Sequence, residues 1–285
     1  MKKIGFFPNT DRDLQLATTR DLADFVRALG CEVFATKELA PLLPNNCQFM
    51  KNYREVCDEV DFLVVLGGDG TMLKAAGHAV YSGTPLLGIN LGNVGYLTDV
   101  EKNHAKSAIS RILADNYKIQ QRMMLQAGLG AATRLALNDI TIYRGFSPRM
   151  IQCVVHINGE YMDTFRADGL VISTPTGSTA YNLAAGGPVL KPDAKMVAIT
   201  PICPASLSAR PAVISHEDHI HIRLPNTRDT VISFDGEGIN HADVTSVCGN
   251  ELEILITPSQ YVTNIIKTNS YGFYEVLRKK IGKTL

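Results

Sequence analysis

The stretch that most constrains the fold is an apolar run that ends abruptly in glycines. Residues 61–66 read Asp-Phe-Leu-Val-Val-Leu and are followed by Gly67, Gly68, Asp69 and Gly70. A continuous apolar run is typical of a strand that is buried on both faces, as in a parallel sheet. Residues 71–76 are rich in helix formers. The glycines therefore predict a tight turn from a buried strand into a helix.

Such a turn places backbone N–H groups and the positive end of a helix dipole beside Asp69. Backbone donors of this kind normally bind anions, so a carboxylate beside them suggests a group that accepts a proton or holds a metal ion. The alternative is that Asp69 only caps the helix. The turn is not a Walker A loop, and Leu73 breaks the G-x-G-x-x-G pattern of dinucleotide-binding turns.

The first third of the chain alternates between expected strands and helices. We expect strands at 3–7, 31–35, 61–66 and 85–90, with a helix over 14–29 that ends at Gly30 and another after Gly70. This alternation predicts a parallel sheet. Ligands bind such sheets at the carboxyl ends of the strands, where Asp69 and Asn90 are expected to lie.

After about residue 100 the pattern changes from alternation to strands. One helix is expected over 103–115 and a short basic helix over 274–281, and Asn158-Gly159 predicts a two-residue hairpin turn. The other elements are strands at 117–129, 133–144, 150–157, 160–165, 170–173, 196–200, 212–214, 219–224, 230–234 and 251–256. We therefore expect an α/β domain over 1–100, joined by 266–285, and a β-rich domain over 101–265.

Two polar clusters interrupt the apolar strands of the second part. Asn138 and Asp139 lie within the apolar stretch 137–142, where an amide could read a base edge or a ribose hydroxyl; the alternative is a turn at a strand end. Asp168-Gly169 and the hydroxyl-rich stretch 173–179 flank another buried strand. These groups could donate to phosphate or ribose oxygens, or they could form a helix cap and a turn. Tyr181 could stack on a ring.

Composition limits the class of protein. The chain has 285 residues and 28 basic against 28 acidic side chains, which argues against an electrostatic nucleic-acid binder. We expect neither a spanning helix nor a signal peptide. The six cysteines have no C-x-x-C spacing and predict reduced thiols in a cytoplasmic protein. His216, His219 and His221 suggest a zinc site, but a solvated strand edge is the preferred interpretation.

Three motifs together resemble those of the NAD kinase family. They are Gly67–Thr71, Leu137–Ile140, and Asp168–Leu170 continuing to Thr174–Asn182. Gly-Gly-Asp-Gly-Thr alone is also found in diacylglycerol, sphingosine and phosphofructo-kinases, whereas the Thr-Pro-Thr-Gly-Ser-Thr-Ala-Tyr stretch is far more specific. The similarity extends from Ile4 to Arg278 and so covers nearly the whole chain.

The resemblance implies an NAD kinase that transfers the terminal phosphate of ATP, or of polyphosphate, to the 2′-hydroxyl of the adenosine ribose of NAD. It implies a Rossmann-like or phosphofructokinase-like N-terminal α/β domain and an all-β-rich C-terminal domain, over 101–265, that binds the dinucleotide. Asp69 would be the catalytic base, and Mg²⁺ would enter with ATP rather than in a protein-only site. The donor would contact Gly67, Gly68, Gly70 and Thr71. NAD would contact Asp69, Gly70, Lys74, Asn138, Asp139, Arg149, Arg166, Asp168, Thr176, Thr179, Ala180, Tyr181, Asn182, Ala184 and Glu237.

The chain departs from the family pattern at three positions. Asp139 stands where many members have Glu, Ala205 where they have His, and Glu237 where they have Gln. Two other functions remain as alternatives: a lipid kinase of the diacylglycerol type, for which no membrane-binding helix is evident, and a non-catalytic dinucleotide sensor. The resemblance also suggests a homotetramer or homodimer.

Overall fold

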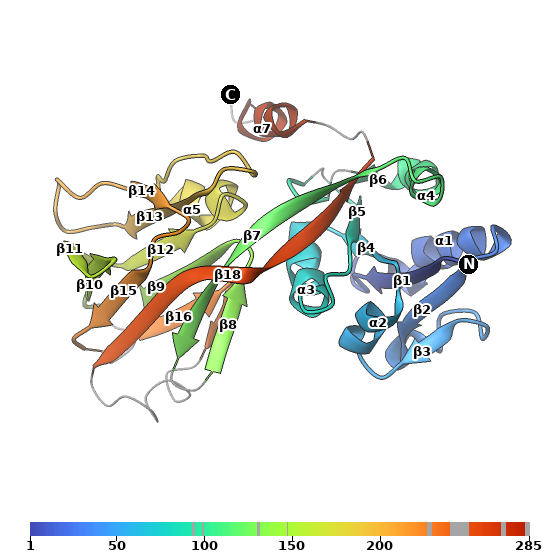
Figure 1. Cartoon of the computed structure of the whole chain (residues 1–285), viewed down its shortest axis with the longest axis horizontal. Coiled ribbons are helices and arrows are strands. Elements are labelled where there is room, and N and C mark those ends of the chain that lie inside the picture. Colours follow the sequence, from blue (N-terminus) through green and yellow to red (C-terminus); the bar gives the residue numbers. More distant parts are fainter. Residues whose placement is uncertain are drawn as a thin grey trace. The chain divides into compact units, whose positions relative to one another are not determined.

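The computed structural model describes residues 1–92, 95–98, 100–129, 132–146, 148–226, 230–239, 251–268 and 272–282. It divides the chain into two compact units, whose elements Figure 1 labels. Unit 1 comprises residues 1–121 and 261–285, and unit 2 comprises residues 122–260. The sequence placed these boundaries at 100/101 and 265/266, so the helix over 105–113 and the segment 261–265 lie in unit 1.

Unit 1 contains a parallel sheet with the strand order β3-β2-β1-β4-β5. The strands are β1 (Lys3–Pro8), β2 (Glu32–Thr36), β3 (Gln48–Met50), β4 (Phe62–Gly67) and β5 (Leu86–Asn90). Every residue of β4 and β5 is buried, as their continuous apolar sequences predicted. The two-residue strand β6 (Val100–Glu101) and Ile265 of β18 both pair with β5.

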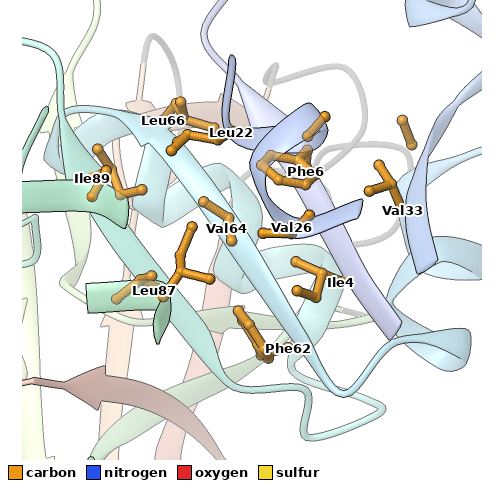
Figure 2. Close-up of a cluster of buried hydrophobic side chains, with 14 of the residues drawn as sticks. Ile4, Phe6, Leu22, Val26, Val33, Phe62, Val64, Leu66, Leu87 and Ile89 are labelled. Atoms are coloured by element: carbon orange, nitrogen blue, oxygen red, sulfur yellow. The ribbon is translucent and has the colours of Figure 1, made fainter. Parts of the chain in front are cut away.

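Helices cover both faces of this sheet. They are α1 (Ala17–Ala28), α2 (Tyr53–Glu59), α3 (Asp69–Ala79) and α4 (Ala105–Leu113). The C-terminal helix α7 (Phe273–Ile281) also belongs to unit 1. Figure 2 shows Leu22 and Val26 of α1 packed against Ile4, Phe6 and Val64 of the sheet. On the other face, a Cβ at Gly5 would lie 2.9 Å from Val56 of α2. The side chains therefore alternate between the two helical layers.

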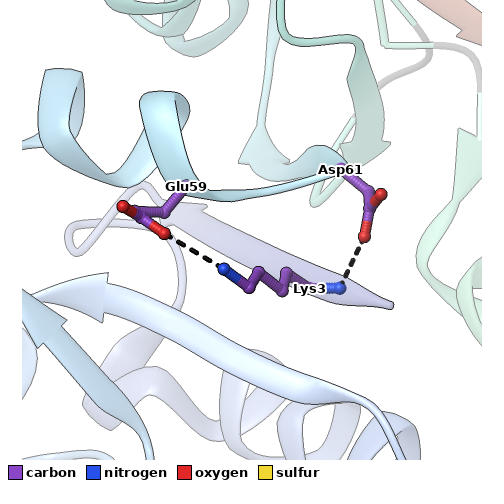
Figure 3. Close-up of polar contacts among 3 residues, drawn as sticks. All are labelled: Lys3, Glu59 and Asp61. Carbon is purple, nitrogen blue, oxygen red and sulfur yellow. Dashed lines mark hydrogen bonds and ion pairs between the residues drawn. The ribbon is translucent and has the colours of Figure 1, made fainter. Parts of the chain in front are cut away.

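Two polar contacts of Lys3 connect the start of β1 to the end of α2 and to the residue before β4. The backbone N–H of Lys3 donates to Asp61 Oδ2 (2.7 Å), and its ammonium lies 3.1 Å from Glu59 Oε2 (Figure 3). Both contacts are exposed, so we expect them to add little to stability.

The first helix differs from its expected length. Gln15 and Leu16 adopt left-handed backbone angles (φ of 52° and 53°), and α1 begins only at Ala17. Leu14 and Leu29, the two ends of the expected helix, are 72% and 51% exposed. Gly30 ends the helix with φ of +80°, as expected.

Unit 2 contains two sheets that enclose one apolar core. The order β14-β13-β12-β9-β16-β17 forms an antiparallel sheet. Its strands are β9 (Asp139–Arg144), β12 (Gly169–Ser173), β13 (Met196–Ile202), β14 (Ala212–Ser215), β16 (Thr230–Phe234) and β17 (Glu237–Ile239).

The second sheet includes the longest strands. It has β7 (Lys118–Leu129), β8 (Ala132–Ala136), β10 (Ile151–Ile157), β11 (Glu160–Ala167), β15 (Ile220–Leu224) and β18 (Leu252–Lys267). The predicted strand 251–256 is therefore only the first part of β18. Asn158 and Gly159 have φ of 52° and 85°, which confirms the predicted hairpin turn. No helix among the described residues is long and apolar enough to cross a membrane.

Candidate active site

The glycine turn joins β4 directly to α3. β4 ends at Gly67 and α3 begins at Asp69, so Gly68 precedes the helix. The hydroxyl of Thr71 accepts hydrogen bonds from the N–H of Gly68 (3.5 Å) and from Asn9 Nδ2 (3.2 Å). A Cβ at Gly67 would collide with this hydroxyl. The turn thus needs glycine at its first position, and the predicted strand-to-helix turn is confirmed.

The side chain of Asp69 is held by a segment outside its own helix. Its Oδ1 accepts from the N–H groups of Leu97 (2.9 Å) and Thr98 (3.2 Å), and its Oδ2 accepts from the N–H of Tyr96 (2.9 Å). The residue is half-buried. Asp69 is the first residue of α3 and Gly68 is its N-cap, so capping of the helix does not explain this carboxylate.

These contacts distinguish the two carboxylate oxygens. A carboxylate has about four acceptor positions, two on each oxygen. Oδ1 receives two backbone N–H bonds and a weaker contact from the Thr98 hydroxyl (3.4 Å), whereas Oδ2 receives one N–H bond. Oδ2 therefore keeps acceptor capacity for another group, while Oδ1 fixes the orientation of the carboxylate.

The segment 95–98 is itself supported from two directions. The amide of Asn90, at the end of β5, donates to the hydroxyl of Thr98 (3.1 Å). The ring of Tyr96 lies 6.4 Å from that of Phe273, and Lys280 lies 5.6 Å above the Tyr96 ring. A Cβ at Gly95 would collide with Asp69 Oδ1. Asn90 and helix α7 thus support the donors that hold Asp69.

The other site residues predicted in unit 1 lie along the same turn and helix. Gly70 and Lys74 are exposed on α3, and Thr71 is buried beneath the turn. Lys74 lies one helical turn beyond Gly70, so the structure places both on the first half of this helix.

In unit 2, the predicted strand over 133–144 is broken at Leu137 and Asn138. β8 ends at Ala136 and β9 begins at Asp139, so Asn138 lies between two strands and not within one. The Asp235 carboxylate accepts from the N–H groups of Leu137 (2.8 Å), Asn138 (2.6 Å) and Asp139 (3.2 Å). One half-buried carboxylate thus satisfies the three donors that the break in the ladder leaves unpaired.

The hydroxyl-rich loop packs against this same break. Thr174 donates from its N–H to the Asn138 carbonyl (2.9 Å) and from its hydroxyl to the Leu137 carbonyl (2.6 Å). A Cβ at Gly177 would collide with the Asn138 carbonyl. The second and third motifs of the chain, far apart in sequence, therefore form one structure.

Most hydroxyls of the loop are used within the protein. Ser178 donates to the Pro175 carbonyl (2.7 Å), and Thr176 is buried. Asn182 is fully buried, and its amide contacts the Ser178 and Pro188 carbonyls and the Thr200 hydroxyl. The helix that follows the loop is only α5 (Tyr181–Ala184). The Asn182 side chain is therefore used within the protein, whereas Thr179 is half-buried.

Tyr181 lies at the open side of this cluster and is 45% exposed. Burial raises the pKa of its phenol, and the nearby Tyr143, Cys203, Asp139 and Asp168 raise it further.

Asp168 has a partner that we did not anticipate. Arg144 Nε lies 2.7 Å and Nη2 lies 3.4 Å from its two carboxylate oxygens, and the Arg144 N–H donates to the Asp168 carbonyl (2.9 Å). Both side chains are about one-third exposed. Asp168 is therefore oriented by a guanidinium before it meets any ligand.

The remaining predicted residues of unit 2 are exposed: Arg149, Arg166, Ala180, Ala184 and Glu237. Glu237 follows the turn Asp235-Gly236, whose φ angles of 52° and 84° match a two-residue hairpin turn. Ala205, where the family has His, is exposed, and its N–H donates to the Arg166 carbonyl (2.8 Å).

Two buried carboxyls have perturbed titration. Burial raises the pKa of Asp139 to about 6, the Thr141 hydroxyl opposes this, and the Asp235 charge adds to it. Burial also raises the pKa of Asp235, against the three backbone N–H groups that it accepts from. Such shifts are common at functional sites.

The proposed zinc alternative gains no support from the histidines. His221 lies beside Glu253 (3.5 Å), and its ring is 6.2 Å from that of His156, while His219 is exposed. Within the described ranges, no group of three His, Cys, Asp or Glu side chains is placed to hold a metal ion.

The described cysteines are all free thiols. Cys47, Cys57 and Cys153 are buried, Cys31 is half-buried and Cys203 is exposed, while Cys248 lies outside the described residues.

Sequence reasoning missed three residues that shape these sites: Tyr96, Arg144 and Asp235. Asp235 had a usable signal, since the Asp-Gly pair marks a hairpin turn. Arg144 lies at the end of a strand that pairs with β12, which follows Asp168, but only the register of β9 and β12 brings the two together. Tyr96 acts through its backbone, which leaves no mark in a sequence.

Two family models cover most of the chain. Residues 4–117 match the ATP-NAD kinase N-terminal domain, and residues 137–265 match the ATP-NAD kinase C-terminal domain. The chain is 36% identical over 287 residues to the NAD kinase of Caldanaerobacter subterraneus subsp. tengcongensis, covering 99% of both chains. It is 37% identical to the NAD kinase of Acetivibrio thermocellus, over 99% of this chain and 97% of that one.

Two solved structures share the fold. Yeast NADH kinase complexed with NADH has a TM-score of 0.82 at 24% identity, covering 98% of this chain and 86% of that one. An NAD kinase from Archaeoglobus fulgidus in complex with ATP has a TM-score of 0.77 at 24% identity, covering 99% and 98%. These neighbours confirm the predicted fold, and the matched domains and full-length identities show that this chain is an enzyme of the NAD kinase family.

Proposed function

We propose that this member of the NAD kinase family phosphorylates the 2′-hydroxyl of the adenosine ribose of NAD with the terminal phosphoryl group of ATP. Phosphorylation of NAD with ATP is the activity of the family. The position of the accepting hydroxyl and the roles of individual residues are our inference. Phosphoryl transfer requires mainly positioning and charge neutralisation from the protein.

The observation that carries this proposal is the fixed carboxylate of Asp69. Three backbone N–H groups orient it at the glycine turn, and Oδ2 keeps capacity to accept one more hydrogen bond. We infer that the accepting ribose hydroxyl donates to Oδ2, and that Oδ2 takes its proton as the ribose oxygen bonds to the terminal phosphorus of ATP. The bond from that phosphorus to the bridging oxygen breaks, and ADP leaves. The first N–H groups of α3 have no partner within the helix and suit the donor's phosphate oxygens.

NAD would be bound by the accessible residues of unit 2. Tyr181 offers a ring face, Asn138 and Thr179 are half-buried polar groups, and Asp168 is oriented by Arg144. Arg149 and Arg166 are exposed cations suited to the pyrophosphate of NAD. Within unit 2, Asp139, Ala180, Ala184 and Glu237 are further proposed contacts, and Thr176 and Asn182 would maintain the loop. Gly70 and Lys74, on α3 of unit 1, are also proposed NAD contacts.

Magnesium fits this site only as a companion of the donor. The glycine turn offers one carboxylate, Asp69, and the described residues contain no cluster that could form a protein-only cage. Mg²⁺ commonly binds through one or two carboxylates plus substrate phosphates. When bound in this way it would neutralise charge on the donor's phosphates.

The test is an NADP-formation assay, with ATP and polyphosphate run in parallel, on the native chain and on Asp69→Asn. The native chain should form NADP with ATP. Asp69→Asn should lower kcat by about 10²–10⁴-fold, the usual contribution of a general base, with NAD affinity nearly unchanged. A variant that keeps more than about a tenth of the rate would exclude Asp69 as the base. NAD binding by the native chain without ADP release would favour the sensor alternative.

We also propose that the enzyme is cytoplasmic and forms a homotetramer or homodimer. The free cysteines support a reducing compartment. The oligomer rests on the family resemblance alone, and light scattering after size-exclusion chromatography would test it.

A further inference from the structure

Arg12 extends over the glycine turn from the loop between β1 and α1. Its Nη1 lies 3.2 Å from the position that a Cβ would take at Gly68 and 3.6 Å from that at Gly92. We propose that Arg12 is a positioning residue that binds the phosphate chain of the donor at this turn. This inference rests on the proposed function and adds to it a phosphate-binding side chain outside the three motifs.

The loop that carries Arg12 is fastened to both ends of the glycine turn by Asn9. The backbone N–H of Asn9 donates to the carbonyl of Leu66, just before the turn (2.8 Å). Its side-chain amide donates to the hydroxyl of Thr71, just after the turn (3.2 Å). The amide oxygen of Asn9 also accepts from the Arg12 N–H (3.1 Å), and the Asn9 carbonyl accepts from the same N–H. The Arg12 backbone is thereby set in register with the turn.

The far end of the loop is equally constrained. Asp13 is buried and accepts from the N–H groups of Thr18 and Thr19 (both 2.9 Å), which fixes the start of α1. Between Asp13 and Thr18, Gln15 and Leu16 both have positive φ. L-residues rarely adopt this conformation twice in succession. Backbone strain of this kind persists only where the surroundings hold it, and it is concentrated at functional sites.

The guanidinium itself is exposed and uncommitted. Across the described parts of the chain, no carboxylate pairs with Arg12 and no acceptor takes a hydrogen bond from its side chain. By contrast, Arg144 of unit 2 is paired with Asp168. A guanidinium presents a planar set of donors that matches phosphate oxygens. Near Gly68 and Gly92, the guanidinium would contact a phosphate chain that the N–H groups at the start of α3 also bind.

Glycine at these two positions leaves the guanidinium room to approach the backbone. A methyl group at position 68 would be tighter against Arg12 than ordinary van der Waals contact, whereas one at position 92 would not. The close approach identifies Gly68 as the part of the turn nearest to Arg12. The competing explanation is that Arg12 is only a solvated surface residue, which the following experiment excludes or supports.

The experiment compares Arg12→Ala and Arg12→Lys with Arg20→Ala, a control that removes an exposed arginine from α1. Steady-state rates are measured with ATP varied at saturating NAD, and with NAD varied at saturating ATP. Arg12→Ala should raise KM for ATP at least about tenfold, because a charge-assisted hydrogen bond contributes at least that factor. KM for NAD should stay within about twofold, Arg12→Lys should recover part of the loss, and Arg20→Ala should match the native chain.

Equilibrium titration with Mg·ATP separates this inference from the proposed function. If the native chain forms no NADP, the proposed function fails, and ATP affinity alone decides the role of Arg12. Unchanged KM and unchanged ATP affinity in Arg12→Ala would overturn the inference. Equal rises in both KM values, or a lowered melting temperature, would assign Arg12 a structural role and also overturn it.

Discussion

The Asp235 carboxylate lies 2.6 Å from the backbone nitrogen of Asn138, the shortest of three hydrogen bonds that it accepts from consecutive N–H groups. These two residues are 97 positions apart in the sequence. The contact converts a break between β8 and β9 into a defined loop and fixes the Asn138 backbone within it.

Asp235→Asn should disrupt this loop. An amide replaces one acceptor oxygen with a donor that faces backbone N–H groups, which leaves one or two of these groups unpaired. Each unpaired buried donor costs about 1–3 kcal/mol, so we expect the free energy of unfolding in urea to fall by about 2–4 kcal/mol and KM for NAD to rise. Glu237→Gln, an exposed change two residues away, is the control and should stay within about 0.5 kcal/mol. An unchanged urea midpoint for Asp235→Asn would contradict this account.

Asp139→Asn should change how stability depends on pH. Burial raises the pKa of Asp139 to about 6 from 3.8. The folded state therefore favours the protonated form, and the stability that this group contributes is full below pH 3.8 and lost as the pH rises through about 6. The asparagine keeps an oxygen for the Thr141 hydroxyl and carries no charge. We expect a gain of up to about 3 kcal/mol at pH 8 and none below pH 4.

Thermal unfolding across this pH range is the measurement. Asp193→Asn is the control. The hydrogen bond from Lys191 lowers the pKa of Asp193, the opposite direction to Asp139, so this variant should show no gain in stability at pH 8. A stability difference for Asp139→Asn that is the same at pH 4 and pH 8 would show that Asp139 does not titrate as stated.

Gly95→Ala should impair catalysis while leaving NAD binding largely intact. The new methyl group would occupy the place of Asp69 Oδ1, so the carboxylate or the segment 95–98 must move. We expect kcat to fall by about 10²-fold, the effect of a misplacement of about 1 Å at a reacting centre. Gly77→Ala is the matched control: a Cβ there meets nothing, and alanine should stabilise α3 by about 0.5–1 kcal/mol. A Gly95→Ala enzyme with native kcat would separate Asp69 from the reaction.

Arg144→Ala should weaken NAD binding more than it weakens the fold. The pair with Asp168 is about one-third exposed, so its loss should cost less than about 1 kcal/mol of stability. Asp168 would lose its orientation, and KM for NAD should rise several-fold with kcat little changed. Lys191→Ala removes one partner of the exposed pair with Asp193 in the same unit and should leave KM unaltered. Equal KM values for the two variants would limit the Arg144–Asp168 pair to a surface contact.

The sequence predicted the elements that local chemistry determines. Continuous apolar runs identified β4 and β5, Asn158-Gly159 identified a hairpin, and the glycines after Leu66 identified the turn into α3. From the sequence we expected one continuous strand in place of β8 and β9. The residues at the break, Leu137 and Asn138, are an ordinary apolar and an ordinary polar residue, and neither marks the end of a strand. The break depends on Asp235, and no local pattern records a partner so distant.

Only part of the candidate site could be predicted, because its contacts also come from residues that are distant in the sequence. Asp69 was identified as special by the glycines around it, but the N–H groups that hold it come from residues 96–98, about 28 positions away. Ser178 and Asn182 have side chains suited to a ligand, yet the fold uses them internally. Residue type alone does not distinguish a polar group that faces a ligand from one that closes a loop.

Unit 1 is assembled from two stretches of chain, residues 1–121 and 261–285. A ribosome that has just finished the first stretch must translate all of unit 2, for roughly 10–30 s at ordinary elongation rates, before α7 emerges. During that interval Tyr96 lacks the Phe273 and Lys280 contacts that brace the segment around Asp69. The nascent chain would therefore fix the Asp69 carboxylate last, only after unit 2 has been made.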